Sequence, residues 1–135
     1  MAKHSVVCAF LLPLALAALA GCGAKYEKVV IEPNQPLEDI KLLVDRHVSL
    51  KHKPPARLQD LNPYEPEGPI GYRALLCGTC ILVYGVGTSQ APADADKVLA
   101  YEAEASANGG YVLMQDGTVK KMTAAEFQSA PKAKL

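Results

Sequence analysis

Tryptophan is absent from this 135-residue sequence, and phenylalanine occurs only twice. Neither sign of charge is in excess, because 14 lysine and arginine residues balance 14 aspartate and glutamate residues. A chain without surplus positive charge lacks the electrostatic field that gathers nucleic acid. We therefore expect no nucleic-acid partner.

Clustered metal ligands are also lacking. His47 and His52 stand five residues apart, off the i, i+4 spacing that places two ligands on one helix face. No second cysteine pair accompanies Cys77 and Cys80. We expect both histidines to be helix-end cations or surface residues, and we expect no metal, no cofactor and no catalytic residues.

Only one long apolar run is present, from Val6 to Ala18, and it follows the basic pair Lys3-His4. A short positive region, an apolar core and small residues before a cleavage site are typical of a secretory signal. The core is too short to span a bilayer comfortably. We therefore assign residues 1–21 to a signal peptide, whose removal leaves 114 residues, enough for one small domain.

The apolar run ends at Leu19-Ala20-Gly21-Cys22, which resembles the lipobox of bacterial lipoproteins. The resemblance implies cleavage before Cys22 and acylation of that cysteine, so that three acyl chains anchor the protein in a lipid bilayer. Glycine rather than aspartate follows the cysteine, which favours the outer membrane over the inner one. An ordinary secretory signal followed by a chance cysteine is the alternative.

We interpret residues 22–36 as a tether. Within it, we expect residues 29–31 to lie against the domain as an edge segment. A helix is predicted over residues 37–50, because apolar residues recur there at steps of three and four. Pro36 suits the first turn of this helix, and Pro54-Pro55 ends it. One face of this helix contains Leu37, Ile40, Leu43, Val44, His47 and Val48, and we expect Leu43 and Val44 to be buried against the sheet.

The second half of the chain predicts strands. We expect a surface loop over residues 57–72, a strand over 74–86 interrupted at the cysteines, and a strand over 97–103 with Leu99 and Tyr101 on one side. Asp116-Gly117 between two β-rich runs predicts a hairpin with a type I′ turn, in which both residues have positive φ. Thr123 to Glu126 has the spacing of a capping box.

The predicted fold class is α+β, with one N-terminal amphipathic helix packed on an antiparallel β-meander of about four strands. The globular domain spans residues 37–130, and residues 131–135 form a flexible tail. We interpret Asp116 and Gly117 as turn residues rather than as a catalytic or metal-binding pair.

Cys77-Gly78-Thr79-Cys80 is the one motif with possible reactivity. Strand-like residues flank it, whereas a redox pair has its first cysteine at a helix N-terminus. The hypothesis is a local disulfide between Cys77 and Cys80. Two buried free thiols, or a redox or metal role, stay open as alternatives.

The segment from Gly109 to Lys120, with the strand at residues 98–102 before it, resembles the closing segment of bacterial type II pseudopilin-like proteins, the H-X9-DG motif. The likeness covers most of residues 37–127 and implies a pilin-like domain. Two features depart from that family. Ser106 occupies the histidine position, and a lipobox replaces the long apolar helix that packs pilin filaments.

These observations predict a non-enzymatic lipoprotein in the outer membrane, held there by acylated Cys22 and facing the periplasm. Its pilin-like domain would serve a structural role or bind an envelope protein. The alternative function is that of a thiol–disulfide redox protein acting through Cys77 and Cys80.

Overall fold

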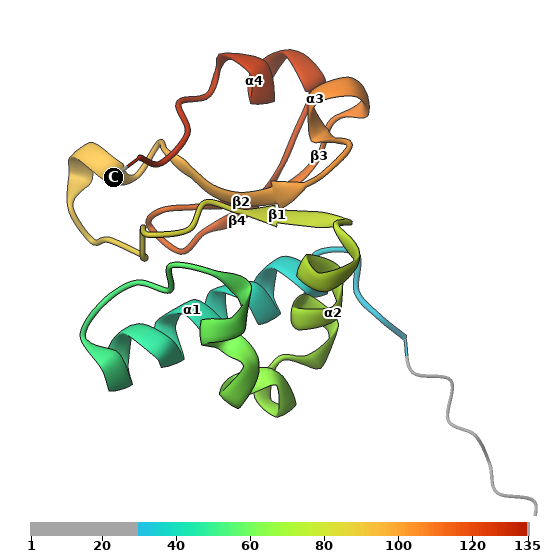
Figure 1. The fold of residues 1–135 in the computed structure, drawn as a ribbon. Helices are drawn as coiled ribbons and strands as arrows, with labels where there is room; N and C mark the ends of the chain where they lie inside the picture. The colour runs from blue at the N-terminus through green and yellow to red at the C-terminus, as the bar shows by residue number, and fades with distance from the viewer. Residues whose placement is uncertain (1–29, 135) are drawn as a thin grey trace, which may run out of the picture.

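The computed structural model describes residues 30–134, so the predictions for the signal peptide and Cys22 lie outside the described residues. The chain forms a four-stranded antiparallel sheet in the order β1-β2-β3-β4, with helices on both faces (Figure 1). The predicted α+β class is confirmed. In chain order the elements are α1 (Gln35–Lys51), η1 (Leu58–Glu67), α2 (Pro69–Cys77), β1 (Cys80–Leu82), η2 (Pro92–Asp94), β2 (Val98–Glu102), α3 (Ala105–Asn108), β3 (Gly110–Met114), β4 (Val119–Met122) and α4 (Ala124–Ser129).

The predicted N-terminal helix is α1, and its apolar stripe is buried as expected. Leu43 and Val44 have no exposed surface, and Leu37 and Ile40 are equally enclosed. A proline stands in the first turn, where a missing N–H costs no hydrogen bond. The helix ends at Lys51, and the residue that caps it, His52, has a φ of 55°. None of the helices within residues 30–134 is long and apolar enough to cross a membrane.

The predicted loop over residues 57–72 is wrong, because most of it is helical. The 3-10 helix η1 and the α-helix α2 occupy it. Helix α2 begins at Pro69. The carboxylate of Asp39, in α1, accepts hydrogen bonds from the backbone N–H groups of Ile70 (3.0 Å) and Gly71 (3.1 Å). These amides are the orphan donors of a helix start. Helix α2 is therefore capped by a residue from another helix, a signal that its own sequence does not contain.

The predicted strand over residues 74–86 is confirmed only at residues 80–82 and is wrong elsewhere. Ala74 to Cys77 form the last turn of α2, and the strand β1 covers only residues 80–82. Gly78 ends the helix with a φ of 74°, a left-handed conformation that glycine adopts without strain. The short apolar run at residues 74–76 is compatible with either a helix or a strand. It is helical in the structure, where α2 packs against α1.

Strand β2 lies where the sequence predicts it, but its two faces do not alternate. Val98 pairs with Met114 and Ala100 pairs with Leu113, so β2 has one residue more than β3 between these pairs. This is a β-bulge at Leu99, which turns Leu99 and Ala100 toward the same core. The prediction that Leu99 and Tyr101 share a side is therefore wrong.

The hairpin between β3 and β4 is confirmed, but its turn is not type I′. Gly117 has a φ of 90°, whereas among the described non-glycine residues only His52 has a positive φ. The N–H of Gly117 donates to the carbonyl of Met114 (3.0 Å), and the N–H of Met114 donates to the carbonyl of Thr118 (2.8 Å). This is the pattern of a three-residue loop closed by a glycine bulge.

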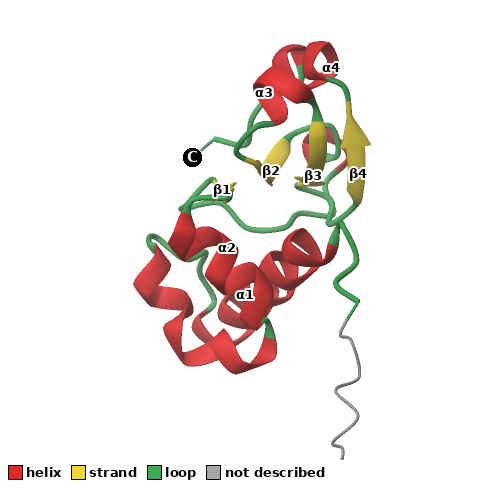
Figure 2. Cartoon of the chain, turned by 90° about the vertical axis from the view of Figure 1, so that its right-hand side faces the viewer, coloured by secondary structure: helices red, strands yellow, loops and turns green. Residues whose placement is uncertain are grey.

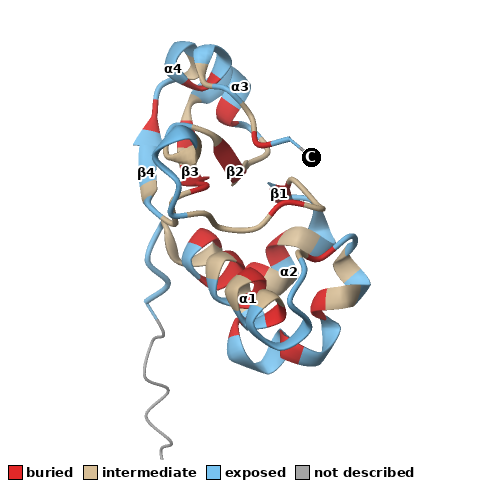
Figure 3. Ribbon diagram, turned by 90° about the vertical axis from the view of Figure 1, so that its left-hand side faces the viewer, coloured by how far each residue is buried: buried red, intermediate tan, exposed pale blue. Residues whose placement is uncertain are grey.

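The sheet separates two apolar cores (Figure 2). Helices α1 and α2 cover one face, and α3 and α4 cover the other (Figures 1 and 3). The larger core contains buried residues of α1, η1, β1, β2 and β3. The smaller core contains Val98, Ala105, Val112, Met114, Met122 and Phe127.

Both ends of the described chain differ from expectation. The flexible tail predicted from residue 131 is instead bonded to β2: Val98 donates to Pro131 and accepts from Ala133, each at 2.8 Å. The short strand β1 leaves this part of the β2 edge free, and the tail occupies it. At the other end Val30 and Ile31 are 74% and 55% exposed, so these two residues do not form the predicted edge segment.

Candidate functional site

Cys77 and Cys80 lie close in sequence but in different surroundings. The structure holds both as free thiols, with Cys77 exposed and Cys80 buried, so the predicted disulfide is not formed in it. Cys77 is the last residue of α2 and Cys80 the first residue of β1, because Gly78 and Thr79 carry the chain out of a helix and into the sheet. The disulfide hypothesis assumed a strand on both sides of Cys77 and Cys80, whereas the structure has a helix before them and a strand after them.

This geometry does not favour redox chemistry. Cys77 stands at the carbonyl end of α2, opposite to the N-terminal position that activates a redox thiol. Burial, with a smaller contribution from the negative charge of Glu102, raises the pKa of the Cys80 thiol to about 11. Cys80 is consequently a protonated, unreactive thiol at neutral pH.

Asp116 holds the hairpin turn, as the sequence predicts. Its Oδ1 atom accepts a hydrogen bond from the backbone N–H of Thr118 at 2.8 Å. Within residues 30–134 no group of three or more histidine, cysteine, aspartate or glutamate side chains is arranged to hold a metal ion. The hydrogen bond from Thr118 shows that the Asp116 carboxylate stabilises the hairpin turn.

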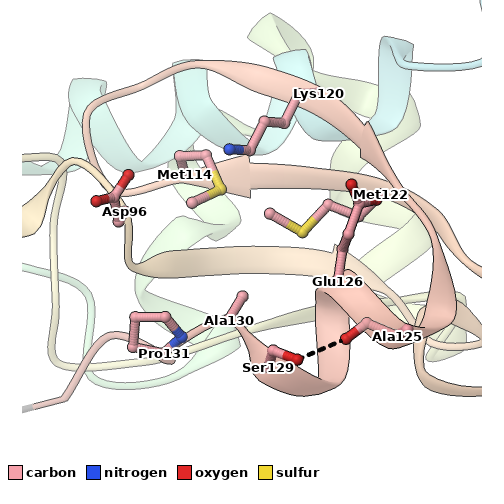
Figure 4. Close-up of a pocket in the computed structure, with 9 residues that line it drawn as sticks. All are labelled: Asp96, Met114, Lys120, Met122, Ala125, Glu126, Ser129, Ala130 and Pro131. Atoms are coloured by element: carbon pink, nitrogen blue, oxygen red, sulfur yellow. Dashed lines mark hydrogen bonds between the residues drawn. The ribbon is translucent and has the colours of Figure 1, made fainter.

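A groove lies between α4 and the sheet on the face of the smaller core (Figure 4). Its volume is about 490 Å³. Figure 4 shows Met114 and Met122 beside each other, with Lys120 above them and α4 opposite. Methionine side chains adapt their shape to irregular apolar partners, so this floor suits a partner's apolar side chain. The groove is lined by Asp96, Met114, Lys120, Met122, Ala125, Glu126, Ser129, Ala130 and Pro131.

The Glu126 side chain of this groove is held by the start of α4. Thr123 accepts a hydrogen bond from the N–H of Glu126 at 3.2 Å, and the Glu126 carboxylate accepts from the N–H of Thr123 at 2.7 Å. The predicted capping box is thus confirmed. Hydrogen bonds from Thr123, and then the positive charge of Lys120, lower the pKa of Glu126. The groove therefore presents a methionine floor beside two carboxylates, of which Glu126 is fixed by the cap, and one ammonium group.

A second cavity, of about 440 Å³, lies at the C-terminal end of α1. His47 lines this cavity and is only 4% exposed, because η1 folds over its side chain. The ring of Tyr64 packs edge-on against the His47 ring, with 5.9 Å between the ring centroids. The prediction of a helix-end or surface histidine is wrong for His47, whereas His52 is exposed at the helix end as expected. The cavity is lined by His47, Lys51, Lys53, Pro54, Ala56, Gln59, Asp60 and Pro63.

Sequence reasoning missed both hollows, and the reason is the same for each. The groove needs β3, β4, α4 and the tail together, and the cavity needs the end of α1 and the folded η1. Residues 57–72 carry the prolines and glycines of a loop, so no sequence signal placed η1 over His47.

Comparison with protein-family models, with curated proteins and with solved structures gives no match to this chain. The lipobox and pseudopilin resemblances therefore stay predictions made from the sequence.

Proposed function

We propose that the chain is a non-enzymatic lipoprotein of the cell envelope that presents its domain to a protein partner. The observation that carries the proposal is the sequence Leu19-Ala20-Gly21-Cys22 at the end of the apolar run. Acylated Cys22 would hold the protein in the outer membrane, and the domain would face the periplasm.

The position of α1 gives this anchor a short tether. The helix begins at Gln35, so twelve residues, 23 to 34, separate it from Cys22. At about 3.3–3.6 Å for each extended residue, such a segment reaches roughly 40 Å. The domain would therefore stay near the membrane surface with room to meet a partner beside it.

The domain that we propose for this role is pilin-like. Helix α1 packs on a four-stranded antiparallel sheet whose strands follow one another in chain order, which is the arrangement that the resemblance implies. The sequence offers no long apolar helix after a prepilin cleavage site. We therefore expect a single presented domain rather than a filament subunit, with the groove beside α4 as its binding surface.

The anchor is tested by replacing Cys22 with serine and following fatty-acid labelling and membrane fractionation. Labelling is expected to disappear and the protein to leave the membrane fraction, because serine lacks the thiol that accepts the lipid. Cys77→Ser is the matched control, since it removes an exposed thiol outside the lipobox and should stay labelled. Persistent labelling of Cys22→Ser would refute the proposed anchor.

The binding surface is tested by crosslinking the envelope protein that lies beside this lipoprotein. Lys120→Glu reverses the ammonium charge in the groove, and Lys121→Glu changes the neighbouring residue, whose side chain lies near the Tyr111 ring on the other face of β4. We expect Lys120→Glu alone to weaken the crosslink. Equal loss in both variants would place the partner elsewhere.

A further inference from the structure

Strand β4 forms one edge of the sheet. It is last in the order β1-β2-β3-β4, and Figures 2 and 3 both show it at the margin. At the β1 edge the tail supplies further hydrogen bonds, because Val98 of β2 bonds to Pro131 and Ala133. In the described part of the chain no segment bonds to the outer side of β4. Such an edge can accept an extended chain as a further strand.

The register of β3 and β4 tells which backbone groups of this edge point outward. Residues of an antiparallel pair bond to the neighbouring strand in alternation. The N–H of Met114 bonds to the carbonyl of Thr118, so every second residue of β4 after Thr118 bonds to β3. Val119 and Lys121 lie between these residues and direct their N–H and C=O groups outward. Among the described residues, these outward groups have no hydrogen-bond partner.

The side chains of β4 alternate between the two faces of the sheet. Lys120 and Met122 line the groove beside α4, whereas Val119 packs against the larger core on the other face. The groove continues past Met122 into a neighbouring hollow of about 380 Å³, which shares Met122 and Glu126 with it. A strand added to β4 would therefore lay every second side chain over this groove.

The charges along the groove differ from one end to the other. Within residues 30–134 no carboxylate lies within 4 Å of the Lys120 ammonium group. Figure 4 shows Glu126 at the Met122 end of the groove and Asp96 at the Met114 end. An acidic side chain of a partner is thus attracted opposite Lys120, but it would meet the Glu126 carboxylate opposite Met122. An apolar side chain suits the second position.

We propose that the partner adds an extended segment to β4 as a further antiparallel strand, with an apolar residue opposite Met122 and an acidic residue two positions later, opposite Lys120. This inference rests on the proposed role of the groove as a binding surface, and it names the class of partner segment. The residue between these two lies opposite Lys121 and pairs through its backbone alone. The antiparallel direction continues that of the sheet and is the more stable per residue.

A second copy of this chain does not suit the same edge. If two β4 strands paired antiparallel in full overlap, Lys120 of one would lie opposite Lys121 of the other. Like charges directly opposite each other destabilise a strand pair, and lysines on an edge strand are a common protection against self-association. The lysine that opposes self-pairing attracts a carboxylate, so it selects for a different partner.

The test follows amide hydrogen exchange of the full chain in detergent by NMR. The probe is a short threonine-rich peptide that carries one leucine and, two positions later, one glutamate. On saturation we expect slower exchange at the amides of Val119 and Lys121, because they then bond to the peptide. The amides of Lys120 and Met122 bond to β3 in the free chain and serve as the internal reference.

Two methylated peptides test the strand pairing without changing the protein. Methylation of the N–H between the leucine and the glutamate removes a donor that faces β4, so we expect the protection to disappear. Methylation of the leucine N–H removes a donor that faces away from β4 and should be tolerated. Equal protection by both peptides would overturn the proposal. Slow exchange at Val119 and Lys121 before peptide is added would also overturn it, because the tether or a second copy would then occupy the edge.

Variants at Lys121 separate backbone pairing from charge. Lys121→Pro removes the outward N–H, at a position where an edge strand tolerates proline, and should weaken peptide binding about tenfold. Lys121→Ala removes the same side chain, keeps the N–H and should bind as the wild type does. Melting temperatures check that both variants fold.

The same variants distinguish failure of this inference from failure of the proposed binding surface. We expect both Lys120→Glu and Lys121→Pro to weaken the crosslink to the envelope protein. Loss in Lys120→Glu but not in Lys121→Pro would overturn the strand addition alone and leave the groove as the binding surface. No loss in either variant would overturn both.

Discussion

The two faces of the sheet are covered to very different degrees. Within residues 30–134, the face beneath α1 and α2 belongs to a core with 14 buried residues, whereas the core on the α4 face has six. Figure 3 shows the difference as buried residues along α1 and mostly exposed ones on α3 and α4. The difference teaches that the core on the α1 face supplies more of the stability, while the thin layer of α4 leaves a groove open beside β4.

Polar contacts follow the same division. On the α1 face the buried carboxylate of Asp39 joins two helices by accepting from the N–H groups of Ile70 and Gly71. On the other face α4 is held by its own capping box and by Phe127, whose ring packs against Tyr101 at 4.8 Å. Only the first of these arrangements locks separate elements together through buried hydrogen bonds.

The largest expected effect compares the two cores directly. Leu43→Ala should lower the free energy of unfolding by about 4 kcal/mol, because Leu43 is fully enclosed and the cavity cannot collapse. Met122→Ala should cost only about 2 kcal/mol, because Met122 lines the open groove. Denaturant unfolding of both variants measures the difference, and equal losses would end the distinction between the faces.

Gly71→Ala probes how tightly α1 and α2 approach. An added Cβ would lie 2.5 Å from Cβ of Asp39 and 2.6 Å from the carbonyl oxygen of Pro36, so we expect a loss of about 3 kcal/mol. Gly78→Ala is the control, because its Cβ meets nothing within 4 Å and only the φ of 74° opposes it, at about 1 kcal/mol. Equal melting temperatures for the two variants would contradict the close contact between α1 and α2.

The hairpin of the second half gives a smaller effect. Gly117→Val should destabilise by about 2 kcal/mol, because a β-branched residue is strained at a φ of 90°. Asp116→Asn should be nearly silent, since its side-chain oxygen still accepts from Thr118. If Gly117→Val melts at the temperature of the wild type, the glycine bulge is contradicted. If Asp116→Asn loses an ion that the wild type binds, Asp116 is a ligand.

The capping box of α4 comes next. Thr123→Ala should cost about 1 kcal/mol, because the N–H of Glu126 loses its acceptor. Ser129→Ala keeps the box and should cost less, since its hydroxyl only bonds the carbonyl of Ala125 within the helix. Chemical denaturation checks the order, and the reverse order would show that α4 is held by something other than its cap.

The smallest effect is a pH dependence at the same helix start. The pKa of Glu126 is lowered from 4.5, so its charged form stabilises the folded state at neutral pH, and this contribution is lost as the pH falls through the lowered pKa. The stability difference between the wild type and Glu126→Gln should therefore vanish in acid. A difference that persists well below pH 4.5 would assign it to packing rather than charge.

The sequence by itself determined the features that depend on local chemistry. The apolar period placed α1, the Asp116-Gly117 pair placed the hairpin, and the spacing from Thr123 to Glu126 placed the start of α4. In each case the residues that fix the element lie within a few positions of one another, so their pattern is visible along the chain.

Tertiary structure alone decided the rest. Helix α2 depends on Asp39, 31 positions before Ile70, and the bulge at Leu99 and the bonded tail depend on which strand edge is left open. The burial of His47 depends on η1, whose prolines read as a loop. These features arise because buried backbone groups need hydrogen-bond partners and apolar faces need packing partners. Those partners lie far away in the sequence and come close only in the folded chain.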